Sequence, residues 1–455
     1  MARKMKDSGI EWIGEIPEGW EITKIKHIVS SVTDTDHFMP DSAEFGIPYL
    51  MIGDLKDLSS SIDWDSSKKI SIEDYKKLSI KSRPQIGDII FARYASIGTT
   101  CYIDTDRDFL VSYACLTIHP SDLIIGKFLS YYLKSSSFAE DVLRRTNSNT
   151  QGNVGKDSLV NATIVLPSII EQTQIVNFLD AKCSDINAML SKTRSSIEEY
   201  KKLKQAVITQ AVTKGVRGER EMKDSGVEWV GEIPKEWVCE KIKYATSISR
   251  GLFNHRPRND ERYYNGKYPF IQTGDVANAT KYIVSYSQTL NELGKSVSKE
   301  FPKGTLTMTI AANVGDVAIL NFDAYFPDSV VGFVPNKNIR TLYLFYVFSA
   351  MKDEFIRTAI KSTQLNLNID RVKETFIPVT LNVNEQCEIE NYLESKCAEI
   401  DGLIAKKEQL VKELESYKKE DLQELAKQLG VDAEGTKKEI AARCAAVEVD
   451  IPDNS

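Results

Sequence analysis

The residues best suited to chemistry in this chain are arginines set among aromatic side chains. The densest group lies in the second half and comprises Arg250, Arg256, Arg258 and Arg262. A guanidinium can bind a guanine edge through two parallel hydrogen bonds, and one good base contact contributes about 1–3 kcal/mol of discrimination. The stretch therefore predicts contact with a nucleic acid. The alternative is that these arginines pair with Asp260 and Glu261 on a solvated loop.

The first half offers fewer cations, and both halves share one polar element. The comparable cations are Arg93, at a predicted strand end, and the adjacent Arg144 and Arg145. A Thr-Gln-x-Asn element occurs once in each half, and its amides are Gln151, Asn153, Gln364 and Asn366. These amides could bind adenine edges or phosphates. An equally good interpretation is a structural turn that caps the helix behind it.

The sequence offers no constellation for catalysis. The Asn/Asp-Pro-Pro-Tyr/Phe motif of adenine methylation is absent. The Gly-Lys-Ser of residues 294–296 has Thr289 where a phosphate loop needs glycine. No nucleophile, base and orienting group can be assembled. We therefore expect a protein that recognises a nucleic-acid sequence rather than an enzyme, with no metal and no cofactor of its own.

Composition is that of an ordinary soluble protein, with 42% apolar and 27% charged residues. The net charge of −7 argues mildly against a nucleic-acid partner, although binding depends on where the basic residues cluster. Seven cysteines without CxxC spacing and only four histidines indicate reduced, cytoplasmic thiols. No secretory segment is recognised, and the apolar stretch from Leu342 to Met351 predicts a buried helix.

The elements that must position these residues occur twice. The sixteen residues from Met5 to Trp20 return from Met222 to Trp237 with twelve identities. A repeat of this period is too long for a solenoid, whose units run to roughly 50 residues, and predicts two whole domains in tandem. Later matches predict a turn and strand before Arg93 in the first half and before Ile310 in the second. Each half is predicted to be a mixed α/β domain.

A long helix follows each predicted domain. Apolar residues recur about every seven positions after Glu171, and neither proline nor glycine interrupts the stretch to Lys214. A twin begins at Glu385 and carries a similar seam. Roughly 44 residues give a rod of about 66 Å, and such a seam predicts a coiled coil in which each copy is the partner of the other. The alternative is two helices that each lie on their own domain. Trp12, Trp20, Trp229 and Trp237 are predicted to anchor the domains to the helix ends.

At this point the chain resembles the specificity subunit of a type I restriction-modification system, over about residues 5–419. The resemblance rests on the repeated Lys-Asp-Ser-Gly-x-Glu-Trp-x-Gly-Glu-Ile-Pro-x-x-Trp opening and on the domain-helix-domain-helix order. It also rests on the Glu-Gln pairs that head the helices, Glu171-Gln172 and Glu385-Gln386. It implies two target-recognition domains that each read half of a bipartite DNA site. Two antiparallel helices, related by a pseudo-two-fold, would set the distance between them.

The resemblance also implies partners. These are double-stranded DNA, two methyltransferase subunits and restriction/translocase subunits, with no membrane. S-adenosylmethionine, ATP and Mg would belong to those partner subunits, and none to this chain. The basic stretch of the second half corresponds in the repeat to an acidic stretch at residues 34–41 of the first half. The two halves are therefore expected to read different sequences through different loops.

The predicted organisation is a first target-recognition domain at 5–170, a helix and spacer at 171–220, a second domain at 221–383, a second helix at 384–419 and a tail at 420–455. The tail departs from the family pattern and resembles a small SAP-like, DNA-binding module, with a plain two-helix cap as the alternative. Its divergence could also weaken one of the two methyltransferase docking sites. Two other functions stay open, a stand-alone DNA-binding or regulatory protein and a coiled-coil scaffold that binds protein.

Overall fold

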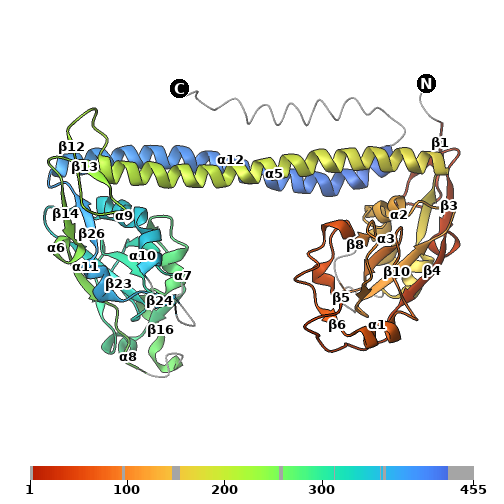
Figure 1. The fold of residues 1–455 in the computed structure, drawn as a ribbon, viewed down its shortest axis with the longest axis horizontal. Helices are drawn as coiled ribbons and strands as arrows, with labels where there is room; N and C mark the ends of the chain where they lie inside the picture. Colours follow the sequence, from red (N-terminus) through yellow and green to blue (C-terminus); the bar gives the residue numbers. More distant parts are fainter. Residues whose placement is uncertain are drawn as a thin grey trace. The chain divides into compact units, whose positions relative to one another are not determined.

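The computed structural model describes residues 4–94, 98–145, 154–255, 260–311, 313–358, 360–361 and 365–428, with side chains left out over 358–366 and after Tyr417. It contains two compact units. Unit 1 comprises residues 1–194 and 408–455, and unit 2 comprises residues 195–407. One copy of the sequence repeat therefore lies in each unit, and each is mixed α/β as predicted (Figure 1).

Each unit contains the same two-stranded hairpin, built from the repeated sixteen residues. In unit 1, β1 (Met5–Asp7) pairs antiparallel with β2 (Glu15–Pro17). In unit 2, β12 (Met222–Asp224) pairs with β13 (Glu232–Pro234) in the same register. The isoleucine of each Glu-Ile-Pro is buried, which fixes the hairpin against the unit's core.

The main sheet has the same strand order in both units. Unit 1 orders it β4-β10-β7-β8 and unit 2 orders it β15-β23-β20-β21-β17, so the first four strands correspond. Their bounds are Val29–Asp34 (β4), Cys115–Pro120 (β10), Ile89–Ala92 (β7), Thr100–Tyr102 (β8), Thr246–Arg250 (β15), Val330–Pro335 (β23), Leu306–Thr309 (β20), Val317–Leu320 (β21) and Tyr282–Ile283 (β17). The central strands β7 and β20 are buried throughout.

A second, smaller sheet forms a lobe on each unit, and here the two copies differ. Unit 1 has three strands in the order β6-β5-β9, and unit 2 has four in the order β18-β16-β22-β19. The bounds are Lys69–Ile70 (β6), Ile47–Leu50 (β5), Leu110–Val111 (β9), Gln288–Leu290 (β18), Tyr264–Phe270 (β16), Ala324–Tyr325 (β22) and Glu300–Phe301 (β19). A shared main sheet thus carries lobes of different build.

The remaining elements join each domain to its long helix. Two further strand pairs close the units, β11 (Thr163–Leu166) with β3 (Glu21–Lys24) and β26 (Phe376–Val379) with β14 (Val238–Lys241). Shorter pieces are η1 (Ile25–His27), η2 (Ile52–Asp54), η3 (Ser59–Ser61), η4 (Glu261–Tyr263), β24 (Ile360–Lys361) and β25 (Leu365–Asn366). The helices are α1 (Ile72–Leu78), α2 (Gly126–Tyr132), α3 (Ser136–Arg145), α4 (Lys156–Asn161), α5 (Ile169–Lys214), α6 (Ile242–Ala245), α7 (Thr273–Ala277), α8 (Glu292–Ser296), α9 (Thr341–Ala350), α10 (Lys352–Thr358), α11 (Ile369–Glu374) and α12 (Val383–Gln428).

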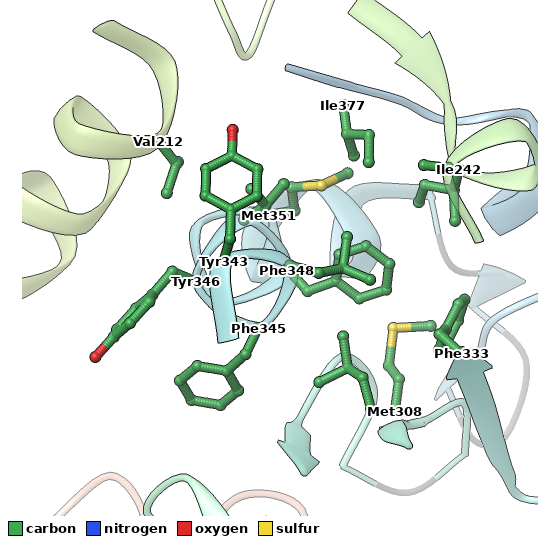
Figure 2. Close-up of a cluster of buried hydrophobic side chains, with 14 of the residues drawn as sticks. Val212, Ile242, Met308, Phe333, Tyr343, Phe345, Tyr346, Phe348, Met351 and Ile377 are labelled. Atoms are coloured by element: carbon green, nitrogen blue, oxygen red, sulfur yellow. The ribbon is translucent and has the colours of Figure 1, made fainter. Parts of the chain in front are cut away.

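The apolar stretch predicted to be a buried helix is α9, at the centre of the unit 2 core. Tyr343 and Phe348 are fully buried there, and Phe348 meets Phe333 of β23 edge-on at 4.9 Å (Figure 2). The Tyr343 hydroxyl donates to the Pro378 carbonyl at 3.2 Å, which satisfies the one polar group that this side chain buries. The prediction from hydrophobicity is confirmed.

The glutamine of each Glu-Gln pair fastens a long helix to its own domain. In unit 1 the buried Gln172 amide accepts from Ile125 N at 2.8 Å and donates to the Leu123 and Pro167 carbonyls. In unit 2 Gln386 repeats the pattern, and its partners there are Arg340 N and the carbonyls of Asn338 and Thr380. A buried side-chain amide that makes three hydrogen bonds away from solvent holds its helix in one register against the domain.

The glutamate of each pair binds the second tryptophan of the repeated opening. Trp20 Nε1 donates to Glu171 at 3.2 Å, and Trp237 Nε1 donates to Glu385 at 3.1 Å. Both indoles are buried. The prediction that these tryptophans anchor the domains at the helix ends is therefore confirmed for this pair, while Trp12 and Trp229 are half-buried.

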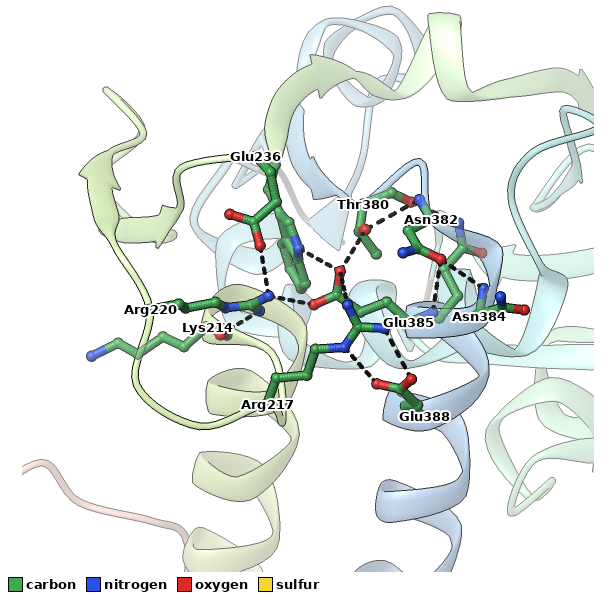
Figure 3. A network of polar contacts seen from close by, with 11 residues as sticks. Lys214, Arg217, Arg220, Glu236, Thr380, Asn382, Asn384, Glu385 and Glu388 are labelled. Carbon is green, nitrogen blue, oxygen red and sulfur yellow. Dashed lines mark hydrogen bonds and ion pairs between the residues drawn. The ribbon is translucent and has the colours of Figure 1, made fainter.

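The Glu385 carboxylate also lies beside arginines of the segment that follows α5. Its carboxylate is 1% exposed and accepts from Arg220 at 2.6 Å and from the Thr380 hydroxyl at 3.0 Å (Figure 3). Arg217 lies 4.0 Å from the same carboxylate and pairs more closely with the exposed Glu388, through two hydrogen bonds of 2.7 and 2.9 Å. In unit 2 the segment after α5 is thereby tied to the first turns of α12.

Within each unit, stretches of α5 and α12 pack against one another and run antiparallel. In unit 2 Lys204 of α5 pairs with Asp401 at 2.7 Å, and Arg217, three residues past the end of α5, meets Glu388 earlier in α12. In unit 1 Leu190 and Leu414 share one apolar cluster. Each helix has 46 residues, and each forms part of both units.

Three further predictions meet the described residues as follows. Helix α12 runs nine residues beyond the predicted end at 419, to Gln428, and residues 429–455 lie outside the described part, so the SAP-like module stays a prediction. The six cysteines that the structure describes are free. Among the described residues, none of the helices combines the length and apolarity that crossing a bilayer requires.

Candidate nucleic-acid interface

In unit 1 the predicted site residue Arg93 lies directly after β7, at one end of the main sheet. Its Nη1 lies 3.6 Å from the Asp34 carboxylate at the end of β4, and the side chain is only 15% exposed. The guanidinium also lies 5.6 Å from the centre of the Tyr94 ring, which is exposed. The end of the sheet therefore presents an aromatic ring with a cation behind it.

The Thr-Gln-x-Asn elements lead to this same end of the sheet in both units. Val154, the residue after the first element, donates its N–H to the Arg93 carbonyl at 2.9 Å. Leu367, after the second element, donates to the Ile310 carbonyl at 2.9 Å. Arg93 and Ile310 are equivalent positions of the repeat. The structure thus brings together two features that are about 60 residues apart in the sequence.

The amides of these elements are not placed by the structure. Gln151, Asn153 and Gln364 lie outside the described residues, and for Asn366 only the backbone, in β25, is described. Their predicted contacts to bases or phosphates therefore stay predictions. The described backbone places only the residues that follow these elements, Val154 and Leu367, at the ends of β7 and β20.

In unit 2 the predicted arginines lie on two elements. Arg250 ends β15, the edge strand of the main sheet, and its Nε donates to the Asp328 carbonyl at 2.5 Å. Arg262 lies on η4 at the edge of the lobe and is 75% exposed. Arg256 and Arg258, in the segment between them, lie outside the described residues. The basic stretch therefore leads from the main sheet to the lobe.

Arg262 is held by Asp260 through Nε and Nη2, the nearer contact being 2.7 Å. The guanidinium holds the pKa of the Asp260 carboxyl well below its usual value, chiefly through these hydrogen bonds. The His255 ring also contacts Asp260, at 3.0 Å, and stacks on Tyr263. The pairing that the sequence left open as an alternative thus exists for Arg262, and it orients a fully charged, exposed guanidinium.

Two lysines that the sequence reasoning did not select lie on the same lobe. Lys267 of β16 and Lys295 of α8 flank the Tyr268 ring, at 5.2 and 4.6 Å from its centre. Glu292 lies beside them, accepting from the Tyr268 hydroxyl at 2.7 Å. The alternation of aromatic and basic residues continues past Arg262 in the sequence, and extending the search along it would have found Lys267.

The lobe of unit 1 carries a comparable set of exposed cations and rings. Lys77 lies 5.7 Å from the centre of the Phe38 ring, and Arg107 lies 5.1 Å from that of Trp64. Phe38 is 45% exposed. Cations over aromatic faces can also stack on nucleobases and meet phosphates. Sequence reasoning missed these pairs because their members are far apart along the chain.

Arg144 and Arg145 are instead engaged at the opposite part of unit 1, near the opening hairpin. The Arg145 guanidinium binds Asp141 at 2.8 and 3.0 Å, and that buried carboxylate also accepts from Thr163 N. Arg144 pairs with Glu140 at 2.9 Å, lies 3.8 Å from Glu11 and packs over the Trp12 ring. These contacts favour a structural role.

The repeat strengthens that interpretation for Arg144. In unit 2 Arg357 of α10 pairs with Glu354 at 2.9 Å and lies 3.8 Å from Glu228. Glu228 is the counterpart of Glu11 in the repeated opening. An arrangement found in both units is part of the shared framework, whereas the residues that distinguish two DNA sequences are expected to differ between them.

Comparison with known proteins agrees with this architecture. The family model of the type I restriction modification DNA specificity domain matches twice, at residues 17–199 and 248–413. These matches span most of both halves, and the chain belongs to this family. The resemblance predicted from the repeated opening is thereby confirmed.

Individual relatives give the same result. The putative type I restriction enzyme MjaX specificity subunit of Methanocaldococcus jannaschii is 26% identical over 351 residues, which cover 75% of this chain and 78% of the relative. The type I restriction enzyme EcoBI specificity subunit of Escherichia coli is 23% identical over 246 residues, covering 52% of this chain and 50% of the relative. These relatives confirm the prediction of a specificity subunit rather than a catalytic one.

A solved structure has a similar fold. It comes from a study of complex assembly and conformational transition of the type I R-M system, and it superimposes with a TM-score of 0.65 at 16% identity. The similarity covers 90% of this chain and 97% of that one. At this identity the likeness concerns the fold alone.

Proposed function

We propose that this chain reads a bipartite DNA site, with one half-site read by each unit. The observation that carries the proposal is the difference between the copies. The main sheets have corresponding strand orders, whereas the lobes have three strands in unit 1 and four in unit 2. Duplicated frameworks with different lobes suit a protein that grips DNA twice and reads a different sequence each time.

The charges on the lobes support this assignment. In unit 2 Lys267 and Lys295 lie close to the half-buried Tyr268 ring, and the same lobe carries the exposed Arg262. In unit 1 Lys77 and Arg107 lie close to exposed or half-buried rings. Such side chains neutralise phosphates and release counterions, so a protein of net charge −7 can still bind DNA through basic surfaces of this kind. Arg93, Arg250 and the Thr-Gln-x-Asn amides complete the proposed contact set.

We further propose that α5 and α12 form an antiparallel spacer that relates the two domains by a pseudo-two-fold. At about 1.5 Å per residue, each helix of 46 residues is about 69 Å long. That length corresponds to about two turns of duplex DNA, since one turn is about 34 Å. A fixed spacer would let the protein skip a constant number of base pairs between the half-sites.

The chemistry would belong to partners. We propose that the chain assembles with two methyltransferase subunits, which use S-adenosylmethionine, and with restriction/translocase subunits, which use ATP and Mg. A methyltransferase must take its target base out of the stack, and the specificity subunit would hold the duplex in place for that step. The proposed role of this chain is positioning alone.

The proposal is tested by a methylation map after co-expression with a candidate methyltransferase subunit from the same genome, in an unmethylated host. We expect adenine methylation at one bipartite motif with a fixed gap. Replacing residues 246–335, the main sheet and lobe of unit 2, with those of a relative should change one half of the motif only. A change in both halves would refute the division of reading between the units.

A stand-alone DNA-binding protein and a protein scaffold are separated from this proposal by two further results. Absence of methylation, with failure to co-purify with the methyltransferase, would favour the stand-alone alternative. DNA affinity that does not change between about 50 and 200 mM salt would exclude both DNA-binding functions, because phosphate contacts make affinity fall steeply over that range.

A further inference from the structure

The lobes of the two units share one surface position at which their chemistry differs. Three of their strands correspond, in the order β6-β5-β9 in unit 1 and β18-β16-β22 in unit 2. The residue before the proline that β5 and β16 have in common pairs with Ile70 in unit 1 and with Leu290 in unit 2. Ile72 and Glu292, each two residues further along the chain, are therefore counterparts.

Both counterparts are the first residues of short helices that begin in the same way. Ser71 caps α1 and Asn291 caps α8, and each side chain accepts from the backbone N–H three positions on, at 3.0 and 3.1 Å. Ile72 is 61% exposed, and the Glu292 side chain is 73% exposed. In each unit this helix lies on the lobe, away from the long helices (Figure 1). The shared framework thus presents an apolar side chain in one copy and an acidic one in the other.

Glu292 is a fixed and ionised hydrogen-bond acceptor. Its Oε1 accepts from the Tyr268 hydroxyl at 2.7 Å and lies 3.4 Å from Lys267 Nζ. The Tyr268 hydroxyl and Lys267 hold the pKa of the Glu292 carboxyl below its usual value, so the group is charged at neutral pH. Among the described residues, none donates a hydrogen bond to Oε2. One oxygen is therefore held by the lobe, and the other is open to a ligand that donates.

The start of α8 is itself fastened to the part of the lobe that carries Arg262. The Asn291 amide donates to the Arg262 carbonyl at 2.9 Å and to the Tyr264 carbonyl at 3.1 Å. Gly294 follows in the helix, and a Cβ at this position would lie only 2.2 Å from the Tyr263 carbonyl oxygen. The helix therefore packs against η4 more closely than any other residue type at position 294 would allow. Glu292 is held in place by the backbone as well as by its side chain.

A carboxylate on a surface that binds DNA is unfavourable beside phosphates, because both are negatively charged. It is favourable beside a base edge that donates a hydrogen bond. In the major groove cytosine presents its N4-amino group, whereas adenine places the N7 acceptor next to its amino group and would repel a carboxylate there. Thymine instead presents a methyl group, which suits an apolar side chain. Lys267 and Lys295, which flank Tyr268, are available for the neighbouring phosphates.

We propose that positions 72 and 292 each read one base of a half-site. Glu292 accepts from the N4-amino group of a cytosine in the half-site of unit 2, and Ile72 contacts the methyl group of a thymine in the half-site of unit 1. This inference rests on the proposed reading of DNA by the two units, and it assigns the base that one side chain of each lobe recognises. One such contact discriminates against the wrong base by about 5- to 150-fold in affinity.

The proposal is tested in the full chain, co-expressed with the candidate methyltransferase subunit, by mapping the methylated motif of single variants. Glu292→Ile should change cytosine to thymine at one position of one half of the motif. Ile72→Glu should make the opposite change, at one position of the other half. Glu292→Gln should shift the preference from cytosine to adenine, because an amide matches the N6 and N7 pattern of adenine.

Binding to synthetic duplexes measures the size of the effect. The unchanged chain should bind about 5- to 150-fold more weakly when the assigned cytosine is replaced by thymine, and Glu292→Ile should lose this preference. Both positions are exposed, so the variants should fold; if Glu292→Ile does not, Glu292→Gln provides the same comparison with adenine in place of thymine.

Two matched controls separate base reading from a change of charge. Glu261→Gln removes an exposed carboxylate from the same lobe of unit 2. Ile86→Glu adds a carboxylate at a position of unit 1 that is 60% exposed and lies beside the start of α2 rather than on the lobe. Both controls should leave every position of the motif unchanged.

Unchanged motifs in Glu292→Ile and Ile72→Glu, obtained while the unchanged chain directs methylation to a bipartite site, would overturn this inference and leave the proposed function intact. An equal rise in affinity of Glu292→Gln for all duplexes would also overturn it, because the carboxylate would then only repel phosphates. If the unchanged chain directs methylation to no bipartite site, the proposed function fails and this inference fails with it.

Discussion

Replacing Glu385 with alanine is expected to destabilise unit 2 strongly, because this carboxylate is buried and carries several contacts. It is 1% exposed, and its partners are Arg220 at 2.6 Å, the Thr380 hydroxyl at 3.0 Å and the Trp237 indole at 3.1 Å. Removing one member of a buried ion pair generally costs about 3–5 kcal/mol, since the other charge is left unpaired in a poor solvent.

The structure places this case at the lower end of that range. Arg220 is 14% exposed and keeps two other partners, Glu236 at 2.9 Å and the Lys214 carbonyl at 3.0 Å. The main loss is then the unpaired indole N–H of Trp237 and the hydroxyl of Thr380. We expect about 3 kcal/mol, or a fall in the unfolding midpoint of roughly 6–12 °C for a domain of this size.

The measurement is thermal unfolding combined with amide exchange over residues 230–237, which assigns the loss to unit 2. Glu388→Ala is the matched control, because it removes a neighbouring carboxylate that is 47% exposed and paired with Arg217. Exposed pairs contribute little, so the control should unfold like the unchanged protein. A Glu385→Ala midpoint within 2 °C of the original, or an equal loss in both variants, would refute the reasoning from burial.

Three further results are expected. Gln172→Leu and Gln386→Leu should each lower the free energy of unfolding by about 2–4 kcal/mol, because each leaves one backbone N–H and two carbonyls without their partner. In urea unfolding the losses should add in the double variant, and marked non-additivity would contradict independent anchoring. Arg262→Ala should weaken DNA binding and reduce the slope of log affinity against log salt concentration by about one counterion. Arg145→Ala should lower the unfolding midpoint and leave the salt slope unchanged. The reverse pattern would exchange the roles assigned to the two arginines. Hydrogen bonds from Lys241 and Lys243 lower the pKa of Glu374 to about 2. The contribution of Glu374 to stability is therefore present above the pKa of the unfolded chain, near 4.5, and is lost as the pH falls from there toward 2. Glu374→Gln should flatten this part of the acid-unfolding curve, and an unchanged curve would show that solvent screens the interaction of Glu374 with the two lysines.

Much of the framework could be predicted from the sequence because it rests on local patterns and on repetition. The heptad spacing after Glu171 and Glu385 predicts long helices, since a helix face is defined by residues three or four positions apart. The buried helix α9 follows from an uninterrupted apolar run. The repeated opening identified the family, because a duplicated motif of sixteen residues is too specific to arise by chance. The second tryptophan of each copy was rightly expected to be structural.

The candidate interface depends on contacts that join distant parts of the chain, and the sequence alone does not state them. Charge and spacing made Arg145 and Arg262 look equivalent, but the fold directs Arg145 onto the buried Asp141 and leaves Arg262 exposed on the lobe. Lys77 lies over Phe38 and Arg107 lies over Trp64, although the two members of each pair are about 40 residues apart in the sequence. Only the folding of the lobe brings them together. The sequence determined the repeated framework because periodicity and burial act locally. Tertiary structure decided which cations remain available for DNA, because that depends on which carboxylate lies within reach of each one after folding.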